Sequence, residues 1–357
     1  MLRSIGYFFV AALLCTVLLE LFVRGAEISA VSETDYQEEI GRIIRPNAKI
    51  VHYNENFTYS QMNKYGYRGP AYPPVKDSGT LRIALLGDSY VEGFQVLDRH
   101  HFRTVLEEEL KNAYQYDNIE ILNFGRSGFG LEDTYAYDKN FVSKFNPDLK
   151  VYVLGALDFY ENSQDKLLPK WKLVEGQLQQ DTSYRTSQEL KVYSLAKLGL
   201  QNSAILQMLR NGINVIKDGR AGEVMLGKLY QRFHQKEIHK SPETKVQEAL
   251  PEVANAILAE LDIQNNVIIV NKDSVSYPLH LEQSLSQNNI VSIHLADTLT
   301  TLKDQLGIDP RYWPVTNTKG HWNYAAHKAV GEYLSKALRE KVYFPRASLG
   351  FKSRIQQ

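Results

Sequence analysis

The chain has 357 residues, of which 43% are hydrophobic and 23% charged, a composition typical of a folded protein rather than a disordered one. Lysine plus arginine and aspartate plus glutamate number 41 each, so no excess of charge indicates a nucleic acid or another polyanion as a partner. The single cysteine, Cys15, excludes an intrachain disulfide and a metal cluster built on cysteines.

Residues 1–24 are predicted to form a membrane anchor. The run from Ile5 to Val23 is interrupted by one charge, Glu20, and is close to the ~20 residues that span a bilayer. Arg3 precedes the run and acidic residues predominate beyond Arg24, so the body is expected on the periplasmic or extracellular side of the inner (cytoplasmic) membrane. A cleaved signal peptide is the alternative, but its apolar core is usually shorter, about 7–15 residues, and its cleavage motif fits this sequence poorly.

Residues 25–80 mix polar residues, tyrosines and prolines, and are predicted to be a tether that packs over the following domain. From residue 81 to 162, buried strand patterns alternate with amphipathic helix patterns. This alternation indicates right-handed βαβ units, a parallel sheet and a three-layer α/β/α domain. The expected strands are 81–86, 119–125 and 149–158, and the expected helices are 101–114 and 131–145.

Residues 163–252 are predicted to be a helical insertion because 187–217 carries apolar residues at helical spacing and the region shows no buried strand. The insertion either lies on the core or caps a binding cleft. The second part of the core covers 253–342, and 343–357 is a tail without an informative pattern. The elements expected after the insertion are a helix at 244–261, strands at 265–273 and 289–295, and a helix at 324–341.

Three turns and a histidine are expected to meet at the carboxyl edge of the sheet, where open α/β proteins bind ligands. They are the Gly-Asp-Ser at 87–89, the glycine-rich turn 125–130, the turn 155–158 and His321. A serine becomes a nucleophile when a histidine takes its proton, and backbone N–H groups such as those of Ser89 and Gly125 stabilise the oxyanion. Alternatively, Ser89 is an ordinary helix cap and His321 is structural. His321 and His327 do not have a common metal-ligand spacing, so no metal is predicted.

Four segments, in order and at similar spacing, resemble the SGNH (GDSL-type) hydrolases and their membrane-anchored bacterial branch. The resemblance implies a flavodoxin-like α/β/α fold, with Ser89 as nucleophile, His321 as general base and Gly125 as an oxyanion donor. Asp88, Asp158 and Asn323 are expected as supporting residues nearby. The segments are NKYGYRGP (63–70), RIALLGDSYVEGFQV (82–96), ILNFGRSGFG (121–130) and GHWNYAAHKAV (320–330).

Two places depart from the pattern of that family. Leu157 occupies the position of an oxyanion asparagine, and Thr318 and Lys319 stand where an aspartate precedes the catalytic histidine. Loss of one oxyanion donor typically costs about 10²–10³ in rate, and loss of the orienting aspartate about 10⁴. Asp158 and Asp309 are candidate substitutes for the aspartate, although the sequence places neither beside the histidine.

Two functions therefore remain open. The first is a serine esterase that removes or transfers O-acetyl groups on a cell-envelope glycan through a dyad of Ser89 and His321, without a cofactor. The second is a catalytically inactive binding or assembly subunit that acts with a membrane protein partner. A phosphoryl-transfer protein is disfavoured because the sequence lacks a G-x-x-x-x-G-K-[ST] loop and an evident acidic metal pair.

Overall fold

A computed structural model describes residues 2–26, 28, 33–52, 54–200, 202–217, 249–264 and 266–342. The chain divides into two compact units. One unit consists of Met1–Asp35 and Gln188–Lys245, and the other of Tyr36–Ser187 and Val246–Gln357.

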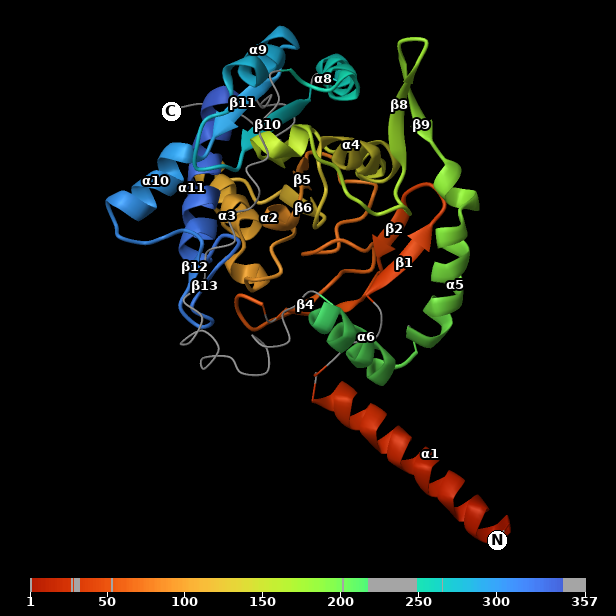
Figure 1. Ribbon diagram of the computed structural model, residues 1–357. Coiled ribbons are helices and arrows are strands. Elements are labelled where there is room, and N and C mark those ends of the chain that lie inside the picture. Colours follow the sequence, from red (N-terminus) through yellow and green to blue (C-terminus); the bar gives the residue numbers. More distant parts are fainter. Residues whose placement is uncertain are drawn as a thin grey trace. The chain divides into compact units, whose positions relative to one another are not determined.

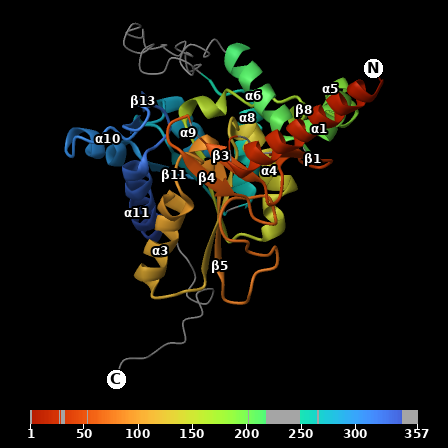
Figure 2. The same cartoon turned by 90° about the horizontal axis from the view of Figure 1, so that it is seen from below.

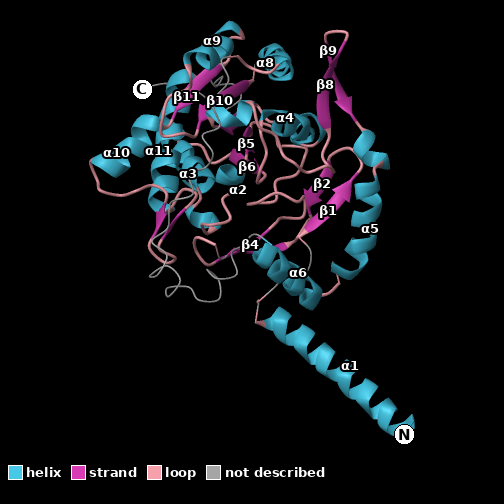
Figure 3. Ribbon diagram, viewed as in Figure 1, coloured by secondary structure: helices cyan, strands magenta, loops and turns pink. Residues whose placement is uncertain are grey.

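The larger unit is built on a five-stranded parallel sheet (Figures 1 and 3). Its central strands are almost wholly buried, as expected for a parallel sheet covered on both faces. The spatial order is β11-β10-β7-β5-β6. The chain continues from β5 to β6 on one side of β5 and then crosses to form β7 on its other side. This reversal makes a topological switch point beside the carboxyl end of β5. The strands are β5 Leu81–Gly87, β6 Ile119–Gly125, β7 Leu149–Leu154, β10 Val267–Asn271 and β11 Val291–His294.

Helices cover both faces of this sheet, which confirms the predicted three-layer α/β/α domain. On one face, α4, α8 and α9 share a hydrophobic core with Leu86 and Phe124. On the other face, α3, α10 and α11 pack on Leu85 and Ile121, and α3 lies beside α11 (Figure 2). The helices are α3 Phe102–Tyr114, α4 Leu131–Asn140, α8 Glu252–Gln264, α9 Leu279–Gln287, α10 Ala296–Asp304 and α11 Tyr324–Lys341.

The segment predicted as a tether contains short strands and a clamp on the core. Buried Arg68 donates from Nη1 to the carbonyl of Glu92 at 3.0 Å and from Nη2 to that of Val96 at 2.6 Å. These bonds hold the chain just after the short helix α2, which follows β5. The elements are β1 Thr34–Gln37, β2 Gly41–Ile44, β3 Lys49–His52, β4 Thr58–Gln61 and α2 Ser89–Glu92.

The region predicted as a helical insertion begins instead with a β-hairpin, β8 Lys170–Val174 and β9 Gln177–Asp181. The hairpin has no fully buried residue, so its sequence carries no buried strand run. Two helices follow within the predicted helical stretch, α5 Gln188–Leu200 and α6 Ala204–Lys217. Ser203 Oγ accepts from the N–H of Leu206 and caps the second helix. Residues 218–248 and 343–357, with the first part of the helix predicted from 244, lie outside the described residues.

The smaller unit contains α1 Leu2–Gly25, α5 and α6. Among the described residues, Arg3–Gly25 is the one helix long and apolar enough to cross a membrane, and its apolar window is not buried. This is the N-terminal apolar helix that the sequence predicts. Its length and composition fit a membrane anchor and also a signal sequence.

Candidate active site

Ser89 stands at the switch point of the sheet, directly after β5. Gly87 has a φ of +150°, and a Cβ at this position would lie 2.5 Å from the carbonyl oxygen of Val153, so the strand ends in a conformation that requires glycine. Asp88 caps α2, since its Oδ1 accepts from the N–H of Tyr90 at 2.9 Å. Because Asp88 is the cap, Ser89 is the first residue of the helix and its hydroxyl is available for another partner.

That partner is His321, as the sequence predicts. Ser89 Oγ lies 2.7 Å from His321 Nε2, although the two residues are 232 positions apart. Trp313 Nε1 donates to the carbonyl of His321 at 3.0 Å, and Asn323 caps α11 by accepting from the N–H of Ala326 at 3.1 Å. The histidine is thus fixed just before a helix, with 31% of its side chain exposed to solvent.

A third side chain, Glu55, completes the site. Its Oε1 lies 2.6 Å from His321 Nδ1 and 2.9 Å from the backbone N of the same residue. Its Oε2 lies 3.0 Å from His52 Nε2. Burial opposes ionisation of this carboxyl, but the hydrogen bonds from His321 and His52 outweigh burial and hold the pKa of Glu55 well below its ordinary value. Glu55 is therefore a carboxylate that accepts hydrogen bonds from both histidines.

The ionised carboxylate determines which nitrogen of His321 carries the proton. Glu55 can only accept, so Nδ1 is assigned as the N–H and the lone pair of Nε2 faces Ser89 Oγ. This is the tautomer that a general base requires. The carboxylate reaches His321 because residue 320 is glycine: a Cβ at Gly320 would lie 2.0 Å from Glu55 Oε1.

The two aspartates considered as orienting groups have other partners. Asp309 Oδ2 lies 2.7 Å from Lys319 Nζ, in an ion pair on the exposed surface. Asp158 contacts Lys272. In the described part of the chain, the carboxylate that His321 contacts is that of Glu55. The predicted dyad of Ser89 and His321 is therefore extended by Glu55 and has the geometry of a triad.

Sequence reasoning missed Glu55 because it lies 266 residues before His321, in the connection between β3 and β4. The segment has an ordinary polar composition and falls within the predicted tether. The signals available are His52 three residues before the glutamate and Gly320 directly before the histidine, and neither identifies an acid by itself.

A cluster of three charged side chains lies beside Ser89. Lys272 Nζ lies 2.6 Å from Asp88 Oδ2, also contacts Asp158, and stands 5.4 Å from the centre of the Tyr90 ring. Burial disfavours the ammonium, but the two carboxylates outweigh it and raise the pKa of Lys272. The lysine thereby ties the carboxyl ends of β5, β7 and β10 together, and it explains why Asp88 and Asp158 belong near Ser89.

Replacing Lys272 with methionine is expected to destabilise the domain by about 3–5 kcal/mol, because it leaves two carboxylates that are only 13% and 18% exposed without their counter-ion. Urea unfolding of the detergent-solubilised chain, followed by circular dichroism, measures the change. Lys319→Met is the matched control: this lysine is 71% exposed and pairs with Asp309 at the surface, so its loss changes stability by less than about 1 kcal/mol. Equal stabilities for the two variants would contradict a structural role for the buried cluster.

The backbone N–H of Gly125, predicted as an oxyanion donor, has an acceptor within the protein. It donates to Asn123 Oδ1 at 2.9 Å. The glycine has a different function in packing, since a Cβ here would lie 2.1 Å from the backbone nitrogen of Glu92. Gly125 thus lets α2 approach the end of β6, and its N–H is already engaged.

The turn 125–130, which the structure describes in full, leaves one N–H without an acceptor among the described residues. This is the N–H of Gly128, which has a φ of +79° and open space where a side chain would stand. The N–H of Ser89 likewise has no acceptor in the described part of the chain. The remaining donors of the turn are Arg126 to the carbonyl of Gly87, Ser127 to Glu92 Oε2, Phe129 to the carbonyl of Arg126 and Gly130 to Asp133 Oδ2.

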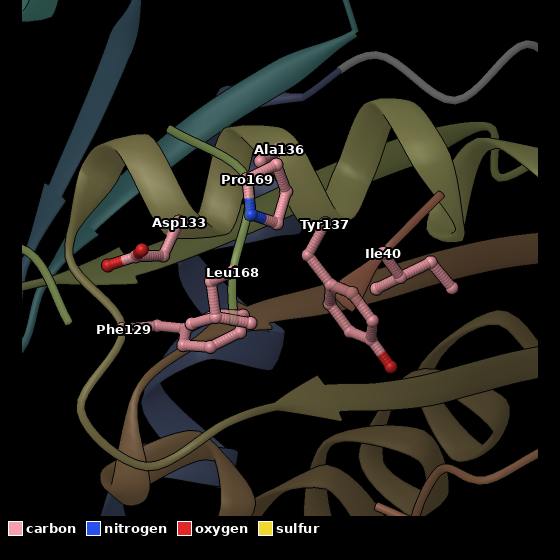
Figure 4. A pocket seen from close by; sticks show the side chains of 7 residues that line it. All are labelled: Ile40, Phe129, Asp133, Ala136, Tyr137, Leu168 and Pro169. Carbon is pink, nitrogen blue, oxygen red and sulfur yellow. The ribbon is translucent and has the colours of Figure 1, made fainter. Parts of the chain in front are cut away.

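A small pocket of about 180 Å³, including its open mouth, lies beside α4 (Figure 4). Its one carboxylate, Asp133, accepts from Lys170 Nζ at 3.0 Å and from the N–H of Ser163 at 2.6 Å. The lining contains none of the three triad residues, so the pocket is separate from them. Its lining residues are Ile40, Phe129, Asp133, Ala136, Tyr137, Leu168 and Pro169.

No protein-family model and no curated protein matches the sequence. Among solved structures, the chain is similar to a protein assigned to the G-D-S-L lipolytic family from Desulfitobacterium hafniense, with 14% identity, a TM-score of 0.33, and coverage of 72% of this chain and 100% of the other. It is also similar to the acetyl xylan esterase AlAXEase (15% identity, TM-score 0.35, coverage 72% and 100%) and to the esterase EstA from Pseudoalteromonas (11%, 0.36, coverage 72% and 97%). At these values the similarities do not assign an activity.

Proposed function

We propose that this protein is a serine esterase whose catalytic triad is Ser89, His321 and Glu55. The observation that carries the proposal is the continuous chain of hydrogen bonds from Ser89 Oγ through both ring nitrogens of His321 to Glu55. In this mechanism Ser89 Oγ attacks the ester carbonyl while His321 Nε2 takes its proton, and Glu55 stabilises the resulting imidazolium. His321 then returns the proton to the leaving alcohol as the C–O bond breaks, which leaves an acyl group on Ser89.

The oxyanion of the tetrahedral intermediate would be bound by the backbone N–H groups of Ser89 and Gly128. Gly128 takes the place of Gly125 in this assignment because the N–H of Gly125 already donates to Asn123 Oδ1. The turn is held near the nucleophile because the N–H of Arg126 donates to the carbonyl of Gly87 at 2.9 Å. Donors fixed before the reaction stabilise the developing charge without reorganisation.

The substrate class we propose is a short acyl ester, with O-acetyl groups on a cell-envelope glycan as the specific case. The cell-envelope location of the substrate is supported by the apolar helix α1. We propose that this helix is a retained anchor that holds the body on the outer side of the membrane. Attack of water on the acyl group of Ser89 gives hydrolysis, and attack of a second glycan hydroxyl gives transfer. Both outcomes use the same triad.

Covalent labelling tests the activated serine without knowledge of the substrate. The full-length chain in detergent is expected to react with a fluorophosphonate, and mass spectrometry should place the adduct on Ser89. Ser89→Ala should remain unlabelled, and His321→Ala should react far more slowly because its serine has lost the base. Absence of an adduct on a folded chain would instead favour the non-catalytic binding subunit.

Leu157→Asn is expected to raise kcat for an aryl acetate, by up to about 10²–10³-fold if the new amide reaches the oxyanion. Leu157 lies in the 3₁₀ turn Ala156–Phe159 that follows β7, next to the aspartate that Lys272 links to Asp88. Leu157→Ala is the matched control, since it provides space without a donor. A gain in both variants would mean that access limits the rate, not the number of oxyanion donors.

A further inference from the structure

The smaller unit contains a polar joint between α1 and α6. Glu20, the single charge in the apolar run, accepts from the N–H of Ala204 at 2.7 Å and of Ile205 at 3.1 Å, and from Ser203 Oγ at 3.0 Å. Arg24 Nη2 donates to the carbonyl of Asn202 at 2.7 Å. A carboxylate at the start of a helix satisfies free N–H groups and complements the helix dipole. The joint therefore fixes the beginning of α6 to the last turns of α1.

The joint fixes the position of α6 along the apolar run. Glu20 lies three residues before the end of that run at Val23, which corresponds to about 4.5 Å along a helix. Around it, Leu21 and Phe22 are each 61% exposed, and earlier in the helix Leu18 is 65% exposed. These side chains have little protein cover, so the start of α6 is fastened where the exposed apolar surface of α1 ends.

One side of α6 is itself apolar and exposed. Leu206, Leu209 and Ile213 are 45%, 53% and 52% exposed and follow one another at helical spacing. On another side of the helix, Ala204 is fully buried. Arg210, which is exposed, follows Leu209 by a rotation of about 100° and Leu206 by four residues, so it borders the apolar side. One side of the helix is therefore packed against protein, and a second, apolar side is exposed.

We propose that α6 is an interfacial helix and that its partner is the phospholipid bilayer, with Leu206, Leu209 and Ile213 inserted at the boundary between headgroups and acyl chains. The occupant is argued from the joint and from the exposed side chains: α6 begins at the level where α1 would leave the bilayer, and both helices expose apolar side chains. Amphipathic helices lie in this boundary with the apolar side buried. The inference rests on the proposed anchor, and it adds a second contact of this unit with the membrane.

Site-specific fluorescence in vesicles of phosphatidylcholine and phosphatidylglycerol tests the proposal. In a full-length Cys15→Ser background, single cysteines at Phe9→Cys, Leu209→Cys and Arg210→Cys are labelled with a polarity-sensitive dye. Lipids with a nitroxide near the headgroup end of the acyl chain should quench the fluorescence strongly at 209 and less at 210, which lies at the border of the apolar side. The label at 9 should be quenched by nitroxides deeper in the bilayer.

The three labels separate this inference from the anchor on which it depends. Quenching at 9, with 209 and 210 equally accessible to water, would overturn the interfacial helix while the anchor stands. If no label is quenched, both proposals fail. A label at 209 that is shielded from water but insensitive to nitroxide lipids, and that becomes exposed as protein is diluted in lipid, would identify a second copy as the partner and overturn the lipid assignment.

Discussion

Alanine at Ser89 or at His321 is expected to lower kcat for a short-chain aryl acetate by up to about 10⁶-fold. In the proposed mechanism Ser89 Oγ is the attacking atom. His321 Nε2, which lies 2.7 Å from this oxygen, accepts the hydroxyl proton. Initial rates of the detergent-solubilised chain and both variants measure the effect. The circular dichroism spectra should be unchanged, because the histidine side chain is partly exposed and the serine is the first residue of α2.

The double variant provides an internal check on this prediction. Residues that act as one unit are strongly non-additive, so Ser89→Ala combined with His321→Ala should be no slower than either single variant. An esterase rate in Ser89→Ala equal to that of the parent would show that hydrolysis occurs at another site or without a serine nucleophile. Such a result would contradict the proposed mechanism but not the described fold.

Glu55→Gln is expected to lower kcat by about 10⁴-fold with a smaller change in KM. Glutamine can turn its NH₂ group toward His321, which would place the proton on Nε2 and direct it at Ser89. It also removes the negative charge that stabilises the imidazolium formed during attack. Steady-state kinetics of the parent and the variant measure the changes in kcat and KM.

Two control variants distinguish the role of Glu55 from a general loss of acidic charge. Asp309→Asn removes the acid nearest in sequence to the expected aspartate. It breaks the ion pair with Lys319, which is 71% exposed, while the asparagine oxygen can still accept from the N–H of Arg311, so kcat should stay within a few-fold of the parent. His52→Gln keeps a donor for Glu55 Oε2 and should have a modest effect. If Glu55→Gln and Asp309→Asn were equally active, Glu55 would not be the orienting residue.

Local patterns in the sequence are sufficient to predict the sheet and the pairing of Ser89 with His321. The strand that ends at Gly87 is marked by a run of apolar residues, and the helix that starts at Tyr324 by periodic apolar residues and a cap. The order of such elements brings Ser89 and His321 to one edge because the carboxyl ends of parallel strands converge there. The β8–β9 hairpin escapes the same reasoning because its residues are only partly buried and do not form an apolar run.

Other features depend on contacts that no local pattern encodes. Glu55 is defined by its approach to His321 across 266 residues, which Gly320 permits. The roles of the glycines in the turn 125–130 depend on which N–H groups find acceptors, and this is decided by Asn123 and Glu92 from other parts of the fold. Sequence spacing identifies such a turn as an anion-binding candidate without showing which donor is free.

The position of Glu55 also determines where the chain can be shortened without loss of the proposed triad. Cutting the chain at the first strand of the sheet, Leu81, would keep the whole five-stranded domain together with its serine and histidine. Such a fragment would lack Glu55, and it would also lack Arg68 and the hydrogen bonds by which Arg68 holds the chain after β5. A truncated protein of this kind would resemble a natural pseudoenzyme even if the intact chain is fully active. Expression boundaries placed before β3 avoid that misinterpretation.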